Sequence, residues 1–268
     1  LDFYLFTSEH PLDLTKHYYD VTGAIKLPAK WAYGPLLWRD ENRDQQQVID
    51  DMETIRELDL ATSGIWVDRP YASGVNSFDF EPNKFPDPAG MVASLHAEGF
   101  RFALWHNIYV GEDQEATADL HQIAEERGYY PPESAPRVNP WGRLIDLTNR
   151  EAYEWWQDNL QYYKDLGVEG YKLDYVEDVI IGINLRRLRW RFADGSTERT
   201  MHKLIQFLFE KVYAEMLPED GGLLLCRSAT IGSQTLGVVL WPGDLDANFA
   251  LHREEMTNRN GRNYVAVG

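Results

Sequence analysis

The chain has 268 residues, of which 44% are hydrophobic, and this is enough for one substantial core. Its formal net charge of −17 argues against nucleic acid and anionic membranes as partners, because clustered Lys and Arg bind phosphates, and it likewise disfavours acidic substrates. The single cysteine, Cys226, excludes an internal disulfide, and no run of about 20 apolar residues could cross a bilayer. We expect a soluble protein, with the cytoplasm favoured and the oligomeric state open.

Short apolar runs alternate with segments of helical period, which is the pattern of successive βα units around a parallel sheet. Six candidate strands follow in chain order, at 31–37, 64–68, 100–105, 170–174, 223–227 and 238–241. Helical spacing is clearest over 44–60, over 148–167, where Thr148 and Glu151 form a capping-box pattern, and over 197–217. Segments rich in Gly, Pro, Asn and Ser at 71–88 and 129–141 predict long loops on one face, which indicate a binding site.

The number of units predicts an incomplete barrel. An eight-stranded (β/α)8 TIM barrel needs roughly 250 residues, and only six units fit here. We therefore predict an α/β fold in which residues 31–268 form a partial (β/α)8 barrel that stops after about six βα units. An open barrel leaves two unpaired strand edges, so we expect low solubility if this segment is expressed alone.

The segment 170–178 combines a strand with acidic residues at its end. Strand alternation puts Lys172 and Asp174 on the same face, with the acid at the carboxyl end, where parallel barrels carry their active sites. A neighbouring ammonium favours the ionised carboxylate, which suits a nucleophile that attacks as an anion. The alternative is a buried ion pair with a structural role only.

The segments 226–234 and 240–248 also place an acid after a strand. Trp241 and Pro242 offer an apolar wall to Asp244, and such a wall favours the protonated form that a general acid requires. The alternative is a Pro-Gly-Asp turn in which the carboxylate hydrogen-bonds its own backbone.

Two further sets of residues stand near strand ends. Trp105 is interpreted either as part of a binding subsite or as barrel filling, and His106 is given no role. Three acids, Glu177, Asp178 and Asp246, raise the alternative of a divalent metal site, yet no paired His spacing or Asp/Asn-rich loop accompanies them. A role in supporting the catalytic acids is favoured for all three.

These motifs resemble glycoside hydrolase family 31. Residues 171–177, Tyr-Lys-Leu-Asp-Tyr-Val-Glu, are similar to that family's nucleophile motif, Lys-x-Asp-x-x-Glu, at the end of the fourth strand. Residues 227–234 and 241–248 resemble its Arg-Ser, Gly-x-Gln and Trp-x-Gly-Asp segments, in which the last Asp is the acid/base. Supporting pieces lie at 28–34, 66–68, 85–88 and 194–202, so the resemblance covers nearly the whole chain.

The resemblance implies a retaining α-glycoside hydrolase that removes terminal α-linked glucose or xylose, without a metal or cofactor. Its partner would be an oligosaccharide or α-glycoside, and the stretch through Asn248 favours the α-xylosidase branch. Asp174 would be the nucleophile and Asp244 the acid/base, with Asp68, Lys172, Arg227 and Trp241 in contact with the sugar. Residues 1–30 would lead in from an N-terminal β-sandwich domain that lies outside the chain.

The sequence also departs from the family pattern. Asp68 is followed by Arg69 and Pro70 where the family often has an apolar residue, and Pro242 replaces a small residue. A later Asp-Gly motif and a substrate-binding histidine are absent, which leaves the activity of this segment open. Three alternatives remain: an α-galactosidase-type barrel, a carbohydrate-binding barrel without turnover, and a metal-dependent barrel hydrolase.

Overall fold

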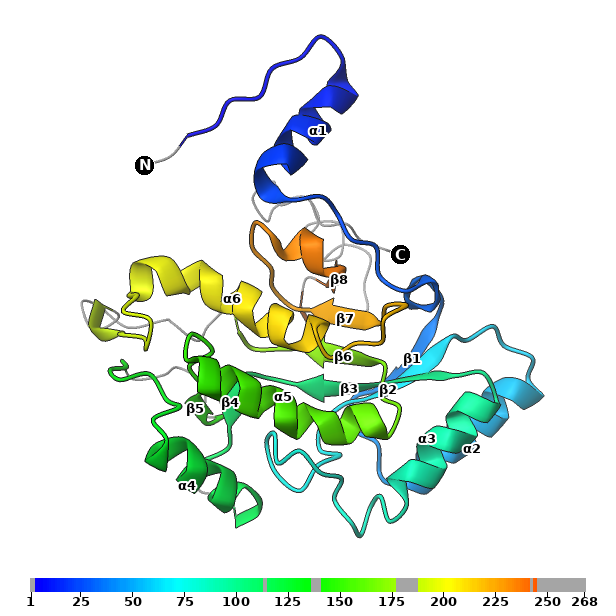
Figure 1. Ribbon diagram of the computed structural model, residues 1–268. Helices are drawn as coiled ribbons and strands as arrows, with labels where there is room; N and C mark the ends of the chain where they lie inside the picture. Colours follow the sequence, from blue (N-terminus) through cyan, green and yellow to red (C-terminus); the bar gives the residue numbers. More distant parts are fainter. Residues whose placement is uncertain (1–2, 113–114, 136–140, 177–187, 242, 245–268) are drawn as a thin grey trace.

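The computed structural model describes residues 3–112, 115–135, 141–176, 188–241 and 243–244, and a six-stranded parallel sheet forms its centre. The strands are β1 (Leu36–Arg39), β2 (Gly64–Val67), β3 (Arg101–His106), β6 (Gly170–Leu173), β7 (Leu223–Cys226) and β8 (Val238–Leu240). Each pairs in parallel with its neighbour, and their spatial order follows the chain (Figure 1). Successive parallel strands separated by helices form a (β/α) barrel sheet, so the predicted fold class and the six strands are confirmed.

Six α-helices accompany the described sheet. They are α1 (Pro11–Thr22), α2 (Gln45–Glu57), α3 (Pro88–Ala97), α4 (Ala118–Glu126), α5 (Arg150–Asp165) and α6 (Glu198–Ala214). Short 3-10 helices span Lys30–Tyr33, Glu115–Thr117 and Ser233–Leu236, and β4 (Tyr109–Val110) pairs antiparallel with β5 (Arg143–Leu144). Helix α2 packs against α3, and α5 against α6, whereas α1 buries no residue and projects beyond the sheet (Figure 1).

Side-chain caps set the starts of α2, α3 and α5, as the His10 imidazole does for α1. Asp44, Asp87 and Asn149 each accept a hydrogen bond from a backbone N–H in the first turn of α2, α3 and α5. These bonds satisfy donors that the first turn of a helix leaves unpaired. The capping-box prediction at Thr148 is wrong, because Asn149 is the cap and accepts from the N–H of Glu151 at 3.0 Å.

The predicted strand at 31–37 is wrong in its first half. Lys30–Tyr33 forms a 3-10 turn, and the N–H of Gly34 donates to the carbonyl of Trp31 at 3.0 Å. Pro35 has no N–H to give to a sheet, so pairing with β2 begins at Leu36. Helices α1, α3 and α4 were not predicted, and α1 lies within the segment interpreted as a lead-in to the barrel.

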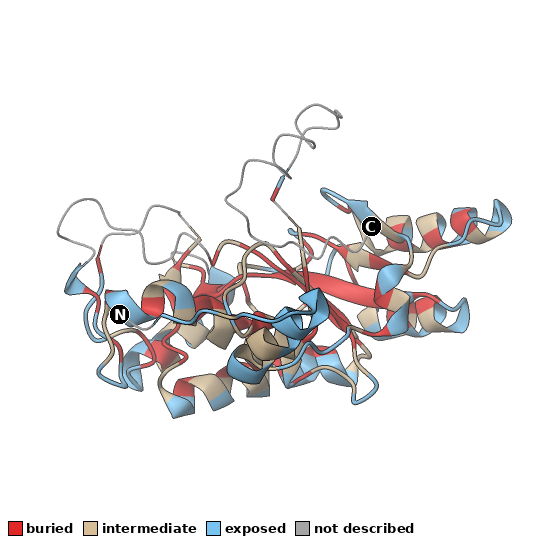
Figure 2. Ribbon diagram, turned by 90° about the horizontal axis from the view of Figure 1, so that it is seen from above, coloured by how far each residue is buried: buried red, intermediate tan, exposed pale blue. Residues whose placement is uncertain are grey.

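The two faces of the sheet bury different side chains because strand residues alternate. A small cluster of Ala32, Ala103, Leu223 and Val239 fills the inner face, packed against Trp66 and other half-buried residues. The larger cluster lies on the outer face, between the strands and the helices. Figure 2 shows this arrangement, with buried strands flanked by helices that turn their exposed sides outward.

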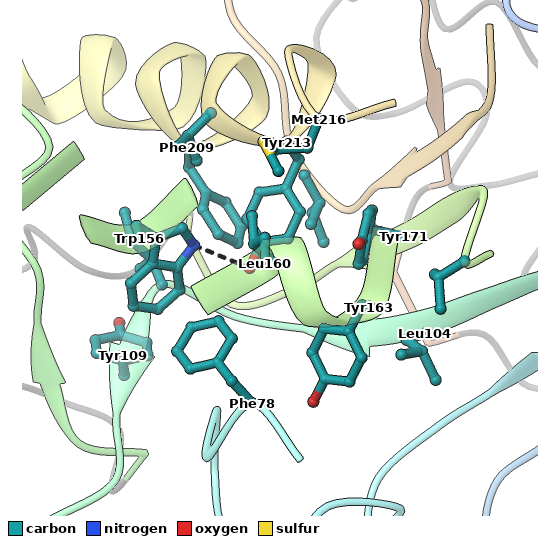
Figure 3. Packing of buried hydrophobic residues seen from close by; sticks show 14 of the residues in the cluster. Phe78, Leu104, Tyr109, Trp156, Leu160, Tyr163, Tyr171, Phe209, Tyr213 and Met216 are labelled. Atoms are coloured by element: carbon teal, nitrogen blue, oxygen red, sulfur yellow. Dashed lines mark hydrogen bonds between the residues drawn. The ribbon is translucent and has the colours of Figure 1, made fainter. Parts of the chain in front are cut away.

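A buried hydrogen-bonded network ties the outer face of β3 to the surrounding helices. His106 lies in it with no exposed surface, its Nε2 2.8 Å from the Tyr71 hydroxyl and its Nδ1 2.9 Å from the Tyr213 hydroxyl. The indole N–H of Trp156 donates to Tyr213 at 3.2 Å, a bond drawn in Figure 3. Burial lowers the pKa of His106 to about 3, so the imidazole is neutral and each ring nitrogen is paired with a hydroxyl.

We predict that His106 makes the fold sensitive to acid. Its pKa of about 3 in the folded protein lies below the ordinary 6.5, so between these values the unfolded chain binds the extra proton and stability falls as the pH falls. Between pH 6 and pH 4 the wild-type protein should lose about 2 kcal/mol more of its free energy of unfolding than His106→Gln does. Urea unfolding at several pH values measures this.

The matched control is His17→Gln, which changes a histidine that is not buried and should leave the wild-type pH dependence intact. Parallel pH profiles for the wild type and His106→Gln would contradict the prediction.

Candidate functional site

Four of the predicted site residues follow directly after four strands of the sheet. Asp68 comes after β2, Asp174 after β6, Arg227 after β7 and Trp241 after β8. Because the strands are parallel and paired in register, their carboxyl ends meet at one edge and these side chains come together there. The predicted Lys172 joins them from two residues before Asp174.

Asp174 is held by donors on both carboxylate oxygens and is only 3% exposed. The indole N–H of Trp105 donates to Oδ2 at 3.0 Å, while Oδ1 accepts from Arg227 Nη1 and from the N–H of Tyr175, each at 3.0 Å. These three bonds fix the plane of the carboxylate at the strand end. Hydrogen bonds to a charged group are the stronger class, so the orientation is well determined.

The ammonium of Lys172 lies between the buried carboxylates of Asp68 and Asp174. The sequence predicted Asp174 as its partner, but Asp68 is the nearer of the two. Its Nζ donates to Asp68 Oδ2 at 2.7 Å and lies 3.8 Å from Asp174 Oδ2. Burial raises the pKa of Asp68, and Lys172 together with the indole N–H of Trp38, which donates at 2.9 Å, acts in the opposite direction. The ion pair predicted around Lys172 is therefore shared, with Asp68 as its nearer member.

Aromatic rings enclose the charged residues. The Lys172 ammonium lies 5.3 Å from the ring centroid of Trp38 and 5.1 Å from that of Trp241, within the range of a cation–π contact. Three further rings continue the enclosure. The ring centroid of Trp141 lies 5.6 Å from that of Trp105 and 5.0 Å from that of Tyr175. For Trp105 this contact and its bond to Asp174 favour the subsite interpretation over barrel filling.

Sequence reasoning missed Trp141 and Tyr175. Tyr175 has a φ of 57°, which is uncommon for a residue other than glycine, and its ring lies 4.8 Å from the guanidinium carbon of Arg227. Its place directly after Asp174 was the available signal, while Trp141 stands at the end of a predicted binding loop. Trp141 therefore packs on Trp105 and Tyr175 on Arg227, the two side chains that orient Asp174.

Asp244 reaches the same site through Arg227. Nη1 of Arg227 lies 3.5 Å from Asp244 Oδ2 and 3.0 Å from Asp174 Oδ1, so these two oxygens are no farther apart than the sum of the distances. The side chain of Asp244 is 66% exposed, and Trp241 lies against Lys172. Of the two residues expected to form an apolar wall for Asp244, Trp241 is therefore placed beside Lys172.

Five other residues named in the sequence analysis are not among the described residues, whereas Gln234 is. Pro242, Glu177, Asp178, Asp246 and Asn248 lie outside the described residues. Gln234, from the Gly-x-Gln piece, donates through Nε2 to the carbonyls of Thr22 at 3.0 Å and of Gly23 at 3.1 Å. It thereby fastens the end of α1 to the chain between β7 and β8.

A pocket of about 220 Å³ adjoins the acidic site on the side of the β2 loop. Residues 69–76 line it together with Trp105 and Trp141. Because Trp105 also donates to Asp174, one indole forms part of both the pocket wall and the setting of the buried carboxylate. The long loop after β2 therefore contributes to the wall of a pocket beside the acidic site.

Sequence comparison relates the chain to carbohydrate-active enzymes. The sequence model of the glycosyl hydrolases family 31 TIM-barrel domain matches residues 25–263. An alpha-xylosidase of Emericella nidulans is 26% identical, with 96% of this chain and 33% of the relative covered. Alpha-glucosidase 2 of Bacillus thermoamyloliquefaciens is 29% identical, with 91% and 32% covered. The chain spans about a third of the length of these relatives.

Solved structures share the fold. An alpha-xylosidase of the same family from a soil metagenome, complexed with xylose, has a TM-score of 0.79 at 22% identity, with 93% of this chain and 37% of that chain covered. A dextranase from Flavobacterium johnsoniae, complexed with glucose, has a TM-score of 0.77 at 23% identity, with 86% of this chain and 29% of that chain covered.

In the part of the chain that the structure describes, no helix has the length and apolar character needed to cross a membrane.

We predict that Lys172→Met destabilises the protein by about 3–5 kcal/mol, because it leaves buried carboxylates without their ammonium. Asp68→Asn should cost less, since Lys172 keeps Asp174 nearby. The double variant should be more stable than the sum of the two single costs implies. Urea unfolding of all four proteins measures this coupling, and strictly additive costs would contradict the shared ion pair.

Proposed function

The chain belongs to glycoside hydrolase family 31, and from this premise we propose that the protein hydrolyses terminal α-glycosides with retention of the anomeric configuration. Asp174 is the nucleophile and Asp244 the acid/base in this proposal. The observation that carries it is the contact of one guanidinium, that of Arg227, with both carboxylates at the catalytic end of the sheet.

The first step needs a carboxylate that is ionised and held in one orientation. Asp174 attacks the anomeric carbon, the bond from that carbon to the leaving oxygen breaks, and Asp244 gives this oxygen a proton. Trp105 and Arg227 support this role, because they hold both oxygens of Asp174 toward the strand ends. The exposed position of Asp244 suits a group that meets a leaving group arriving from solvent.

The second step uses the same two residues. Asp244, now ionised, takes a proton from water, and the oxygen of that water displaces Asp174 from the anomeric carbon. Two displacements at one carbon restore the original configuration. Retaining enzymes hold their carboxyl groups about 5–5.5 Å apart and inverting enzymes about 6.5–9.5 Å apart, and the shared contact with Arg227 supports the shorter spacing.

An α-glucoside or an α-xyloside is the proposed substrate class. The relatives described above are named as an alpha-xylosidase and an alpha-glucosidase, and the residues through Asn248 resemble the α-xylosidase branch. Asp68, Lys172, Arg227 and Trp241 are proposed to contact the sugar or to set the charge around it. An α-galactoside and a sugar that is bound without turnover are the competing outcomes.

We predict that Asp174→Ala and Asp244→Ala each lower turnover of aryl α-glycosides by roughly 10²–10⁴-fold or more, since each removes a group that acts in the transition state. The test uses the natural full-length protein and a panel of glucosides, xylosides and galactosides. NMR of the first product reports the anomer, which should be α.

Asp165→Ala is the matched control, because it removes an exposed carboxylate at the far end of α5 and should leave turnover unchanged. A β-anomer as first product, or full activity in Asp174→Ala, would overturn the proposal. Sugar binding without any hydrolysis would favour a carbohydrate-binding barrel instead.

A further inference from the structure

The pocket beside the acidic site has an unusual charge for this protein. We propose that Arg69 makes it a subsite for an anionic substituent, a carboxylate or sulfonate, on the sugar of the substrate. This inference rests on the proposed α-glycosidase function and names its substrate class. It concerns the residue after Asp68, where the sequence departs from the apolar residue common in the family.

Charge in the pocket is opposite to that of the molecule. The chain carries a formal net charge of −17, yet the described residues that line the pocket include the Arg69 guanidinium and no carboxylate. Salt screens charges beyond about 8–10 Å in solution, so the groups within that distance decide what the pocket attracts. The two carboxylates just behind the lining are already paired, Asp68 with Lys172 and Asp174 with Arg227. An anionic substituent bound at this position would therefore be an exception to the expectation that the net charge disfavours acidic substrates.

Among the residues that the structure describes, the Arg69 guanidinium lies over aromatic rings and donates no side-chain hydrogen bond. Its carbon lies 4.4 Å from the ring centroid of Trp141 and 5.9 Å from that of Trp105, and the residue is exposed. A guanidinium over aromatic faces directs its N–H groups sideways, and this edge matches the two oxygens of a carboxylate. The backbone of Arg69 is also fixed, since its N–H donates to Asp68 Oδ1 at 3.0 Å.

The pocket is close enough to the reacting centre to hold part of the same sugar. Trp105 lines the pocket and donates to Asp174 Oδ2 at 3.0 Å, so one indole separates the two. A sugar at Asp174 that lies along this indole extends a substituent toward the guanidinium. A neutral hydroxymethyl group would leave that cation without a charged partner, whereas a carboxylate or sulfonate would pair with it.

The test compares kcat/KM for an aryl α-glucoside, the matching α-glucuronide and an analogue with a sulfonate at C6. The natural full-length protein should prefer an anionic substrate, and the carboxylate and sulfonate arms show which group it takes. Arg69→Gln should lower kcat/KM for the preferred anion by roughly tenfold to a hundredfold and for the glucoside by less than about threefold. Arg69→Lys should recover part of the loss, and Arg150→Gln, at an exposed helix position, should change neither.

Tryptophan fluorescence separates failure of this inference from failure of the proposed function, because Trp105 and Trp141 line the pocket and report binding without turnover. If no α-glycoside is hydrolysed but methyl α-glucuronide or its sulfonate analogue binds and Arg69→Gln weakens that binding, only the proposed function fails. Preference for the neutral glucoside, with equal effects of Arg69→Gln on all substrates, would overturn the anion subsite.

Discussion

The ammonium of Lys172 lies between the carboxylates of Asp68 and Asp174, and the rest of the site depends on this arrangement. Removing three charges from water costs several kcal/mol for each ion, so they persist only where partners are supplied on every side. Trp38, Trp105 and Arg227 supply them from strand ends or loops at one edge of the sheet. Parallel register is the constraint that brings these elements together.

The two faces of the sheet carry different kinds of side chain. Inner-face positions at the strand ends carry the charged residues, while the outer face of β3 carries His106 and its hydroxyl partners. Trp105 and His106 are adjacent in sequence, yet strand alternation sends one toward the carboxylate and the other into the packed aromatic core. A neutral imidazole can serve there because its two nitrogens are both paired and its burial disfavours the charged form.

Much of this arrangement could be predicted from the sequence because it follows from local periodicity. Six strands, the helices after β1, β5 and β6, and the common face of Lys172 and Asp174 all depend on spacing along one segment. The turn at Lys30–Tyr33 was missed because an apolar run before Pro35 has the composition of a strand.

Pairings between distant segments could not be read in the same way. Lys172 lies nearer to Asp68 than to Asp174, and Trp141 packs on Tyr175. Both contacts depend on how strands and loops approach one another in space. The exposure of Asp244 depends on packing as well, and Trp241 alone did not predict it. Arg69 was visible as a departure from the family, but its stacking on Trp141 gives that departure a physical meaning.

Asp174 as the nucleophile is the central claim, and trapping the covalent intermediate tests it most directly. The natural full-length protein would be incubated with a 5-fluoro-α-glycosyl fluoride, which slows breakdown of the glycosyl-enzyme, and then digested for peptide mass spectrometry. The account predicts one added glycosyl group on the peptide that contains Asp174. A label on another carboxylate, or inactivation of Asp174→Ala with the same stoichiometry, would contradict it.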